Sequence, residues 1–414
     1  MDSAHMPLAG LRIIESSLLG AAAITTSLAD LGATVIKVES PEGDYIREMT
    51  WPVIEGVSLM HYHLNRGKKS ITLDLKTEVG RELYLELVRD ADVVIEAMRP
   101  GVLEKLGLGF EKLRAANPAI VFCTVSGYGM TGPYKDMPSH GIAYDTWSGA
   151  VTPAYDEEGF CYIPEHVSIG INAAPLFGGL AVLAGVLRAR ATGSGCMMEL
   201  GQSDAAAYFD WYRCESHLAY ARPEDVVTGN KADGYVRRPV ATAGMKKGVR
   251  YQLYESGDGH VLFMASEQAF WKNFCAGVER MDLFEKWPGA RYADHAPGNR
   301  ELQAELRTIF KSRSSREWME FSTRVNTPIA PVNTPQNIVN DPQFAARFSL
   351  LPHETHGADM LSFPVHFIDE QLVAPARAPT VGEHTDEVLR DVLGCDETRI
   401  TAIRESGALG STAK

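Results

Sequence analysis

Short apolar runs alternate with amphipathic stretches through the first half of the chain. The runs have the length and β-branched content of buried strands and lie at residues 11–15, 34–39, 70–75, 92–96 and 119–125. Between them, residues 20–31 and 78–91 show the 3.6-residue periodicity of helices. Alternating strands and helices predict an α/β domain, with a parallel sheet that is covered by helices on both faces.

The pattern changes in the second half of the chain. A long helix of small residues is expected from about residue 174 to 191, inside a large domain that covers residues 1–215. Residues 216–250 mix charge, Gly and Pro and predict a linker. A hairpin at 251–265 and helical patterns at 267–278, 299–311 and 315–323 predict a smaller α+β domain at 251–345. Residues 346–414 are expected to form a return linker and a C-terminal helix that packs on the large domain.

Composition excludes several classes of protein. Hydrophobic residues make up 45% and charged residues 22% of 414 residues, which is typical of a soluble globular enzyme. The six cysteines form no C-x-x-C pair, so we expect no zinc site or disulfide framework and a reducing, cytoplasmic location. No signal peptide or membrane span is expected, and the net charge of −13 argues against nucleic-acid binding. A polyanionic ligand would need a local basic pocket.

One glycine-rich motif literally matches a dinucleotide fingerprint. Gly127 to Gly132 reads G-x-G-x-x-G after a predicted strand. Pro133 and Pro138 follow, so no helix can begin there to meet a pyrophosphate. NAD is therefore not expected, and the motif is interpreted as a flexible loop over a pocket.

A group of basic residues lies between residues 65 and 105. Such residues form an anion site when they gather at the ends of parallel strands, but a solvated surface has the same composition. Lys76 and Arg99 each follow a predicted strand at the same edge of the sheet, which favours the anion site. The group consists of Arg66, Lys68, Lys69, Lys76, Arg99 and Lys105.

Three side chains are candidates for catalysis. His140 stands in a loop shaped by Pro138 and Gly141, and histidine can exchange a proton with a weak carbon acid near neutral pH. Asp145 would orient the His140 ring or cap the following turn. Glu165 precedes the long helix and would point into the same cavity or onto the opposite face.

Motifs along nearly the whole chain resemble CoA transferase family III, which includes carnitine and formyl-CoA transferases and α-methylacyl-CoA racemases. Each motif is modest alone, but their shared order is specific. They are residues 7–15, 31–39, 65–71, 73–76, 91–96, 99–102, 106–108, 126–129, 192–195 and 382–385.

The resemblance implies a Rossmann-like large domain, a small domain, and two chains threaded through each other as an interlocked dimer. It implies acyl-CoA and a carboxylic acid as substrates, with no tightly bound cofactor and no metal. Lys105 stands where racemases carry Arg, and Ser40 where many relatives have another Arg. The matching motifs place CoA contacts on Leu73, Asp74, Leu75, Lys76, Ala97, Met98, Arg99, Lys105, Ser139, His140 and Tyr144.

The family's catalytic aspartate is missing from this chain. The matching segment reads Gly170-Ile171-Asn172, and an isoleucine cannot attack a thioester or accept a proton. Three hypotheses follow. The chain is a CoA transferase with Glu165 or Asp145 as nucleophile, a racemase that uses His140, or a non-catalytic CoA-binding subunit of a heteromer with an Asp-bearing homologue.

Overall fold

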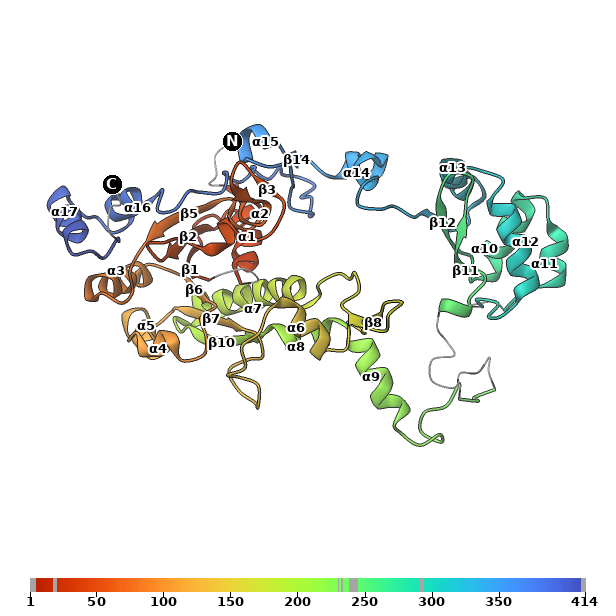
Figure 1. Cartoon of the computed structure of the whole chain (residues 1–414), viewed down its shortest axis with the longest axis horizontal. Helices are drawn as coiled ribbons and strands as arrows, with labels where there is room; N and C mark the ends of the chain where they lie inside the picture. The colour runs from red at the N-terminus through yellow and green to blue at the C-terminus, as the bar shows by residue number, and fades with distance from the viewer. Residues whose placement is uncertain are drawn as a thin grey trace. The chain divides into compact units, whose positions relative to one another are not determined.

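A computed structural model describes residues 5–17, 21–229, 231, 234–237, 245–290 and 294–410. The chain divides into two compact units (Figure 1). Unit 1 consists of Met1–Glu215 and Phe348–Lys414, and unit 2 of Ser216–Arg347.

Unit 1 is built on a six-stranded sheet in the order β10-β7-β6-β1-β2-β5, and every neighbouring pair is parallel. The predicted α/β fold with a parallel sheet is confirmed. The sixth strand, β10, was not among the predicted strands, because it alternates half-buried and exposed residues at the sheet edge. The strands are β1 Arg12–Ser16, β2 Thr34–Glu39, β5 Lys68–Thr72, β6 Val93–Glu96, β7 Val121–Ser126 and β10 Cys196–Gly201.

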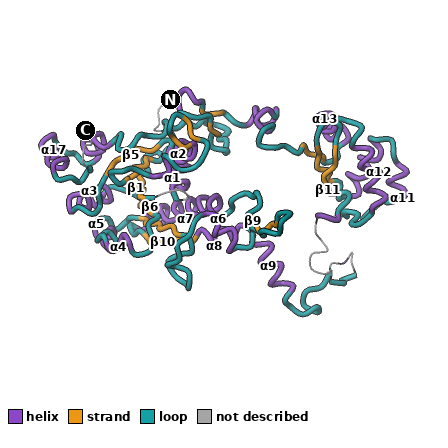
Figure 2. Tube along the Cα trace, viewed as in Figure 1, coloured by secondary structure: helices purple, strands orange, loops and turns teal. Residues whose placement is uncertain are grey.

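Helices cover both faces of this sheet (Figure 2). In β1, Ile13 packs in the core shared with α1 (Ala22–Asp30) and α7 (Gly170–Thr192). Its neighbour Ile14 packs in the opposite core, with α3 (Glu78–Arg89), α5 (Phe110–Ala116) and α17 (Glu397–Glu405). Successive strand residues point to opposite faces, so a strand covered on both sides is apolar throughout, as the sequence pattern indicated.

Helix α7 packs on the sheet through small residues. A Cβ atom on Gly178 would lie 2.5 Å from Ile24 Cδ1, and one on Gly185 would lie 2.9 Å from Val121 Cγ1. Among the described residues, α7 is the one helix whose length and mean hydropathy of 1.7 suit a membrane span, and 39% of it is buried. One apolar face of α7 packs against α1 and β7, as expected for a helix in the core of a domain. The opposite face carries exposed leucines.

The remaining elements of unit 1 are short. The C-terminal helix expected after Thr385 is instead three pieces, two of which contribute to the core that contains Ile14. Helices and turns are η2 Tyr45–Arg47, α2 Leu59–Asn65, α4 Val102–Lys105, α6 Gly141–Trp147, α8 Gln202–Phe209, α9 Trp211–Tyr220, α15 His353–His356, α16 Thr385–Glu387 and η6 Val388–Val392. Hairpins are formed by β3 Val53–Ile54 with β4 Val57–Ser58, β8 Ala154–Tyr155 with β9 Cys161–Tyr162, and β14 Leu350–Leu351 with β15 Met360–Leu361.

Unit 2 packs helices against a three-stranded antiparallel sheet. Its core is a cluster of aromatic rings, in which Phe274 and Phe310 stack 5.4 Å apart. Part of the predicted linker 216–250 lies outside the described residues, and α9 extends into its start. The elements are η4 Met245–Lys247, β11 Tyr251–Glu255, β12 His260–Met264, α10 Gln268–Gly277, α11 Met281–Lys286, α12 Arg300–Phe310, α13 Ser315–Val325, β13 Ile329–Pro331, η5 Ile338–Asn340 and α14 Pro342–Arg347.

Candidate functional site

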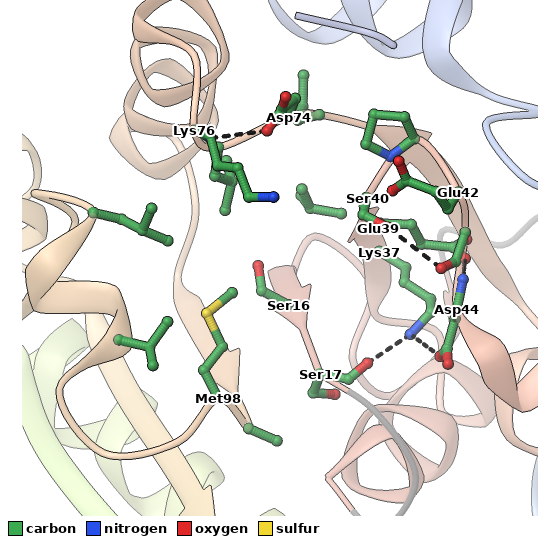
Figure 3. A pocket seen from close by; sticks show the side chains of 18 of the residues that line it. Ser16, Ser17, Lys37, Glu39, Ser40, Glu42, Asp44, Asp74, Lys76 and Met98 are labelled. Atoms are coloured by element: carbon green, nitrogen blue, oxygen red, sulfur yellow. Dashed lines mark hydrogen bonds and ion pairs between the residues drawn. The ribbon is translucent and has the colours of Figure 1, made fainter.

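A cavity of about 510 Å³ opens in unit 1 where β1, β2, β5 and β6 end (Figure 3). Parallel strands share one carboxyl edge, which is where α/β proteins commonly bind ligands. Six of the residues predicted to contact CoA line the cavity, namely Leu73, Asp74, Leu75, Lys76, Ala97 and Met98. Arg99 and Lys105 adjoin lining residues in the chain but do not line the cavity themselves.

Buried charges form one wall of this cavity. The Lys37 ammonium lies 3.0 Å from Asp44 Oδ2 and donates to the Ser17 carbonyl at 2.7 Å (Figure 3). It also lies 3.0 Å from Glu15 Oε1. Burial alone would lower the pKa of Lys37, but the Glu15 and Asp44 carboxylates raise it above its usual value. The Lys37 charge is therefore neutralised inside the protein and is not free for a ligand.

The acid that ends β2 is also engaged. Glu39 accepts hydrogen bonds from the Arg47 guanidinium at 2.7 Å and from the Ser70 hydroxyl at 2.5 Å, and it is 4% exposed. Burial would raise the pKa of Glu39, but Arg47 and Ser70 lower it. Glu39 is thus a structural charge and does not present a carboxylate to a ribose.

Lys76 is the cation of this cavity that remains available. It is exposed, and no ion pair involves it among the described residues. Figure 3 shows its ammonium pointing into the cavity. Its backbone amide donates to Asp74 Oδ1 at 3.0 Å, which fixes the turn that carries it.

The other predicted contacts gather at the carboxyl end of β7, at the same edge of the sheet. Gly127 follows β7, and a Cβ atom there would collide with the Ser139 hydroxyl and lie 2.8 Å from a ring carbon of Tyr144. Ser139 Oγ lies 3.2 Å from Tyr144 Oη. No helix begins between the end of β7 at Ser126 and the start of α6 at Gly141, so the G-x-G-x-x-G motif is a loop. Ser139, His140 and Tyr144 do not line the cavity of Lys76.

The start of α7 joins this group. His140 is the exposed N-cap residue of α6, and a Cβ atom on its neighbour Gly141 would lie 2.9 Å from Ile171 Cγ2. The loop of His140 and the position of the missing aspartate are therefore in contact. A Cβ atom on Gly170 would lie 2.8 Å from Tyr144 Cβ, so only glycine fits there without rearrangement.

The two predicted carboxylates differ sharply in environment. Asp145 is fully buried, and its Oδ1 accepts the amides of Ile169 at 3.1 Å and Gly170 at 2.7 Å. Glu165 is exposed on the segment that leads to α7. Asp145 thus anchors the start of the helix, whereas Glu165 is accessible to a substrate.

Sequence reasoning assigned no role to His166. Its Nε2 lies 3.6 Å from Asp145 Oδ2, and its Nδ1 lies 3.0 Å from the Pro164 carbonyl oxygen. The two residues lie 21 positions apart in the chain and belong to no recognisable sequence motif, so only the fold brings them together.

Similarity to known proteins extends over nearly the whole chain. The profile of CoA-transferase family III matches residues 8–385. The chain is 30% identical over 389 residues to "Probable fatty acyl-CoA transferase Rv3272" of Mycobacterium tuberculosis, covering 91% of this chain and 96% of the relative. It is 29% identical over 410 residues to "Succinyl-CoA--L-malate CoA-transferase beta subunit" of Chloroflexus aurantiacus, covering 95% and 96%.

Solved structures agree with the fold. A crystal structure of an aspartate-to-alanine mutant of Rv3272 matches with a TM-score of 0.74 and 28% identity, covering 93% of this chain and 98% of that one. A CAIB/BAIF family protein from Brucella suis matches with a TM-score of 0.72 and 27% identity, covering 94% and 99%. The predicted enzyme class, a transferase that moves CoA between an acyl-CoA thioester and a carboxylic acid, is confirmed. The chain belongs to CoA-transferase family III.

Proposed function

We propose that CoA binds in the cavity at the ends of β1, β2, β5 and β6, with Lys76 as a phosphate contact. The observation that carries this proposal is that Leu73–Lys76, Ala97 and Met98, separate in the sequence, line one cavity with a free ammonium. The other lysine of the wall, Lys37, is neutralised by Glu15 and Asp44. An overall acidic protein needs such a local cation for a polyanionic ligand.

Calorimetric titration with CoA tests this placement. Lys76→Ala should weaken binding roughly 10-fold and flatten its salt dependence, because one charge-assisted contact is lost. Lys112→Ala, on the exposed side of α5, is the matched control and should bind as the wild type does. Equal affinity of both variants would place CoA elsewhere.

We propose Glu165 as the carboxylate that replaces the missing aspartate. Attack on the thioester carbon breaks the C–S bond and gives an acyl-glutamyl anhydride and CoA thiolate. The thiolate then adds to the glutamyl carbonyl, releases the donor acid and leaves a glutamyl-CoA thioester. The acceptor carboxylate reverses the two steps and leaves as the new thioester. Glu165 is preferred to Asp145 because Asp145 is buried and bonded to backbone amides.

Trapping with hydroxylamine tests the nucleophile. Donors and acceptors can be chosen from the names of relatives, which include succinyl-CoA with malate or glutarate and acetyl-CoA with oxalate. Hydroxylamine should convert Glu165 to a hydroxamate during turnover, detectable by peptide mass spectrometry. Glu165→Gln should abolish both the adduct and transfer, whereas Glu157→Gln, in an exposed turn, should keep both. Turnover without an adduct would show that the acceptor attacks the donor directly.

We further propose that a second chain covers the outer face of α7. Leu176, Leu180 and Leu187 lie on one stripe of this helix and are 63%, 70% and 70% exposed. Helix α9 has no buried residue and adds exposed Trp211 and Tyr212. Apolar surface on this scale marks an interface. The occupant is a second copy, as in an interlocked homodimer, or an Asp-bearing homologue.

Light scattering on purified protein tests this association. Leu180→Glu should convert the dimer to a monomer, since it places a charge in an apolar contact, while Arg188→Glu on the same helix serves as a control for added negative charge. A wild-type chain that is monomeric alone, and gains transferase activity on co-expression with an Asp-bearing homologue, would select the heteromer.

A further inference from the structure

Two buried polar atoms face each other beneath the start of α7. Asp145 Oδ2 and His166 Nε2 are 3.6 Å apart, and neither has a hydrogen-bond partner among the described residues. The Asp145 side chain is 0% exposed and that of His166 is 18% exposed. Such atoms are costly to leave unpaired, so the arrangement requires an explanation.

The other polar atom of each side chain is already engaged. Asp145 Oδ1 accepts the backbone amides of Ile169 and Gly170. His166 Nδ1 lies 3.0 Å from the Pro164 carbonyl oxygen, which can only accept, so Nδ1 must carry a hydrogen. In a neutral ring, Nε2 would then present a lone pair to a carboxylate oxygen. The contact becomes favourable when a proton lies between the two atoms.

With that proton on the histidine, the contact is one between an imidazolium and a carboxylate. Two amide donors at the start of α7 already bond the other oxygen of Asp145. No lysine or arginine occurs in α6, in α8, or in α7 before Arg188, so no other residue of these packed helices neutralises it. The other titratable groups on or against these elements include His140, Tyr144, Glu165, Asp204, Tyr208, Tyr128, which contacts the Tyr144 ring, and Arg213, which donates to the Gly149 carbonyl after α6.

The pair connects three segments of the site. Asp145 lies on α6, whose N-cap is His140, and it bonds the start of α7 next to Ile171. His166 follows Glu165 directly in the chain. A histidine fixed at both ring nitrogens therefore fixes the backbone that carries Glu165.

We propose that His166 is a positioning residue of the transferase, an inference that rests on the proposed role of Glu165. Its imidazolium pairs with Asp145 Oδ2, keeps that carboxylate bonded to the amides of α7, and fixes the backbone that carries Glu165 in front of α7. The pair takes no part in the covalent steps, because Nε2 and Oδ2 are both inaccessible to solvent.

Three variants test the pair through activity. His166→Leu leaves a buried carboxylate without its counter-charge and should lower kcat about 100-fold, with the affinity for CoA unchanged. Adding Asp145→Asn removes the stranded charge and should recover roughly 10-fold of that loss. A double variant no more active than His166→Leu would overturn the proposal.

Nitrogen-15 NMR of labelled histidine tests it without any substrate, in the wild type and in Asp145→Asn. At neutral pH the wild-type Nε2 signal of His166, identified by its loss in His166→Leu, should be that of a protonated nitrogen. In Asp145→Asn the Nε2 signal should shift to that of a bare nitrogen, because the asparagine amide then donates to it. An unprotonated Nε2 in the wild type would refute the pairing. If neither the wild type nor any variant transfers CoA, the proposed function fails. The NMR experiment still shows whether Nε2 of His166 is protonated.

Discussion

Replacing Ile171 by aspartate would restore a carboxylate at the position where the family carries its nucleophile. The structure indicates that the site can accept this change. Ile171 is half-buried in the first turn of α7, and its Cγ2 packs against Gly141. Aspartate is smaller than isoleucine, so no neighbour has to move.

The expected change in stability is small. Loss of part of the apolar contact with Gly141 costs about 1 kcal/mol. An acidic side chain in the first turn of a helix recovers about 0.3–1 kcal/mol through the helix dipole. We therefore expect the melting temperature to change by less than about 3 °C.

The activity of Ile171→Asp measures how complete the rest of the site is. Hydroxylamine trapping during turnover should move the covalent adduct from Glu165 to the new Asp side chain, and CoA affinity should stay constant. Ile171→Asn has nearly the same shape without the charge and is the matched control. A folded Ile171→Asp variant that binds CoA but forms no adduct would refute the reasoning, because it would show that the thioester does not reach the start of α7.

Two further predictions concern the scaffold. Glu15→Gln leaves Lys68 buried without its carboxylate and Lys37 with Asp44 alone. It should lower the free energy of unfolding by about 3–5 kcal/mol in urea titrations, whereas exposed Glu82→Gln should change little. Burial would raise the pKa of Glu15, but the two ammonium groups lower it from 4.5 to about 2, so the wild type should lose about 3 kcal/mol as pH falls through this window. The variant should lack that acid limb, and a variant that keeps the same limb as the wild type would contradict the account. Gly170→Ala places a methyl group 2.8 Å from the Cβ of buried Tyr144 and should lower the free energy of unfolding by about 1–3 kcal/mol. Thermal denaturation measures this loss. An unchanged melting temperature would show that α6 can shift to accommodate the methyl group.

The parallel sheet could be predicted because its strands are buried on both faces. Ile13 and Ile14 face opposite cores, so apolar residues run without interruption and are distinct from the amphipathic helices between them. The edge strand β10 was missed for the same reason, since its alternating exposure leaves no such run. The C-terminal helix was expected in one piece, but Gly394 adopts a positive φ of 64° and ends the turn before α17.

Only the site residues whose location follows directly from their place after a strand could be predicted from the sequence. The residues after β5 and β6 were placed at one edge because parallel strands share a direction, and the cavity lies there. The surroundings of Asp145 and Glu165 could not be predicted, because spacing says nothing about which carboxylate the start of α7 encloses. Helix α6 buries Asp145 against backbone amides, whereas Glu165 is exposed on the segment before α7. With Ile171 in place of an aspartate, the proposed nucleophile Glu165 lies on the segment before the helix, next to His166, whose proposed pairing with Asp145 would fix that backbone.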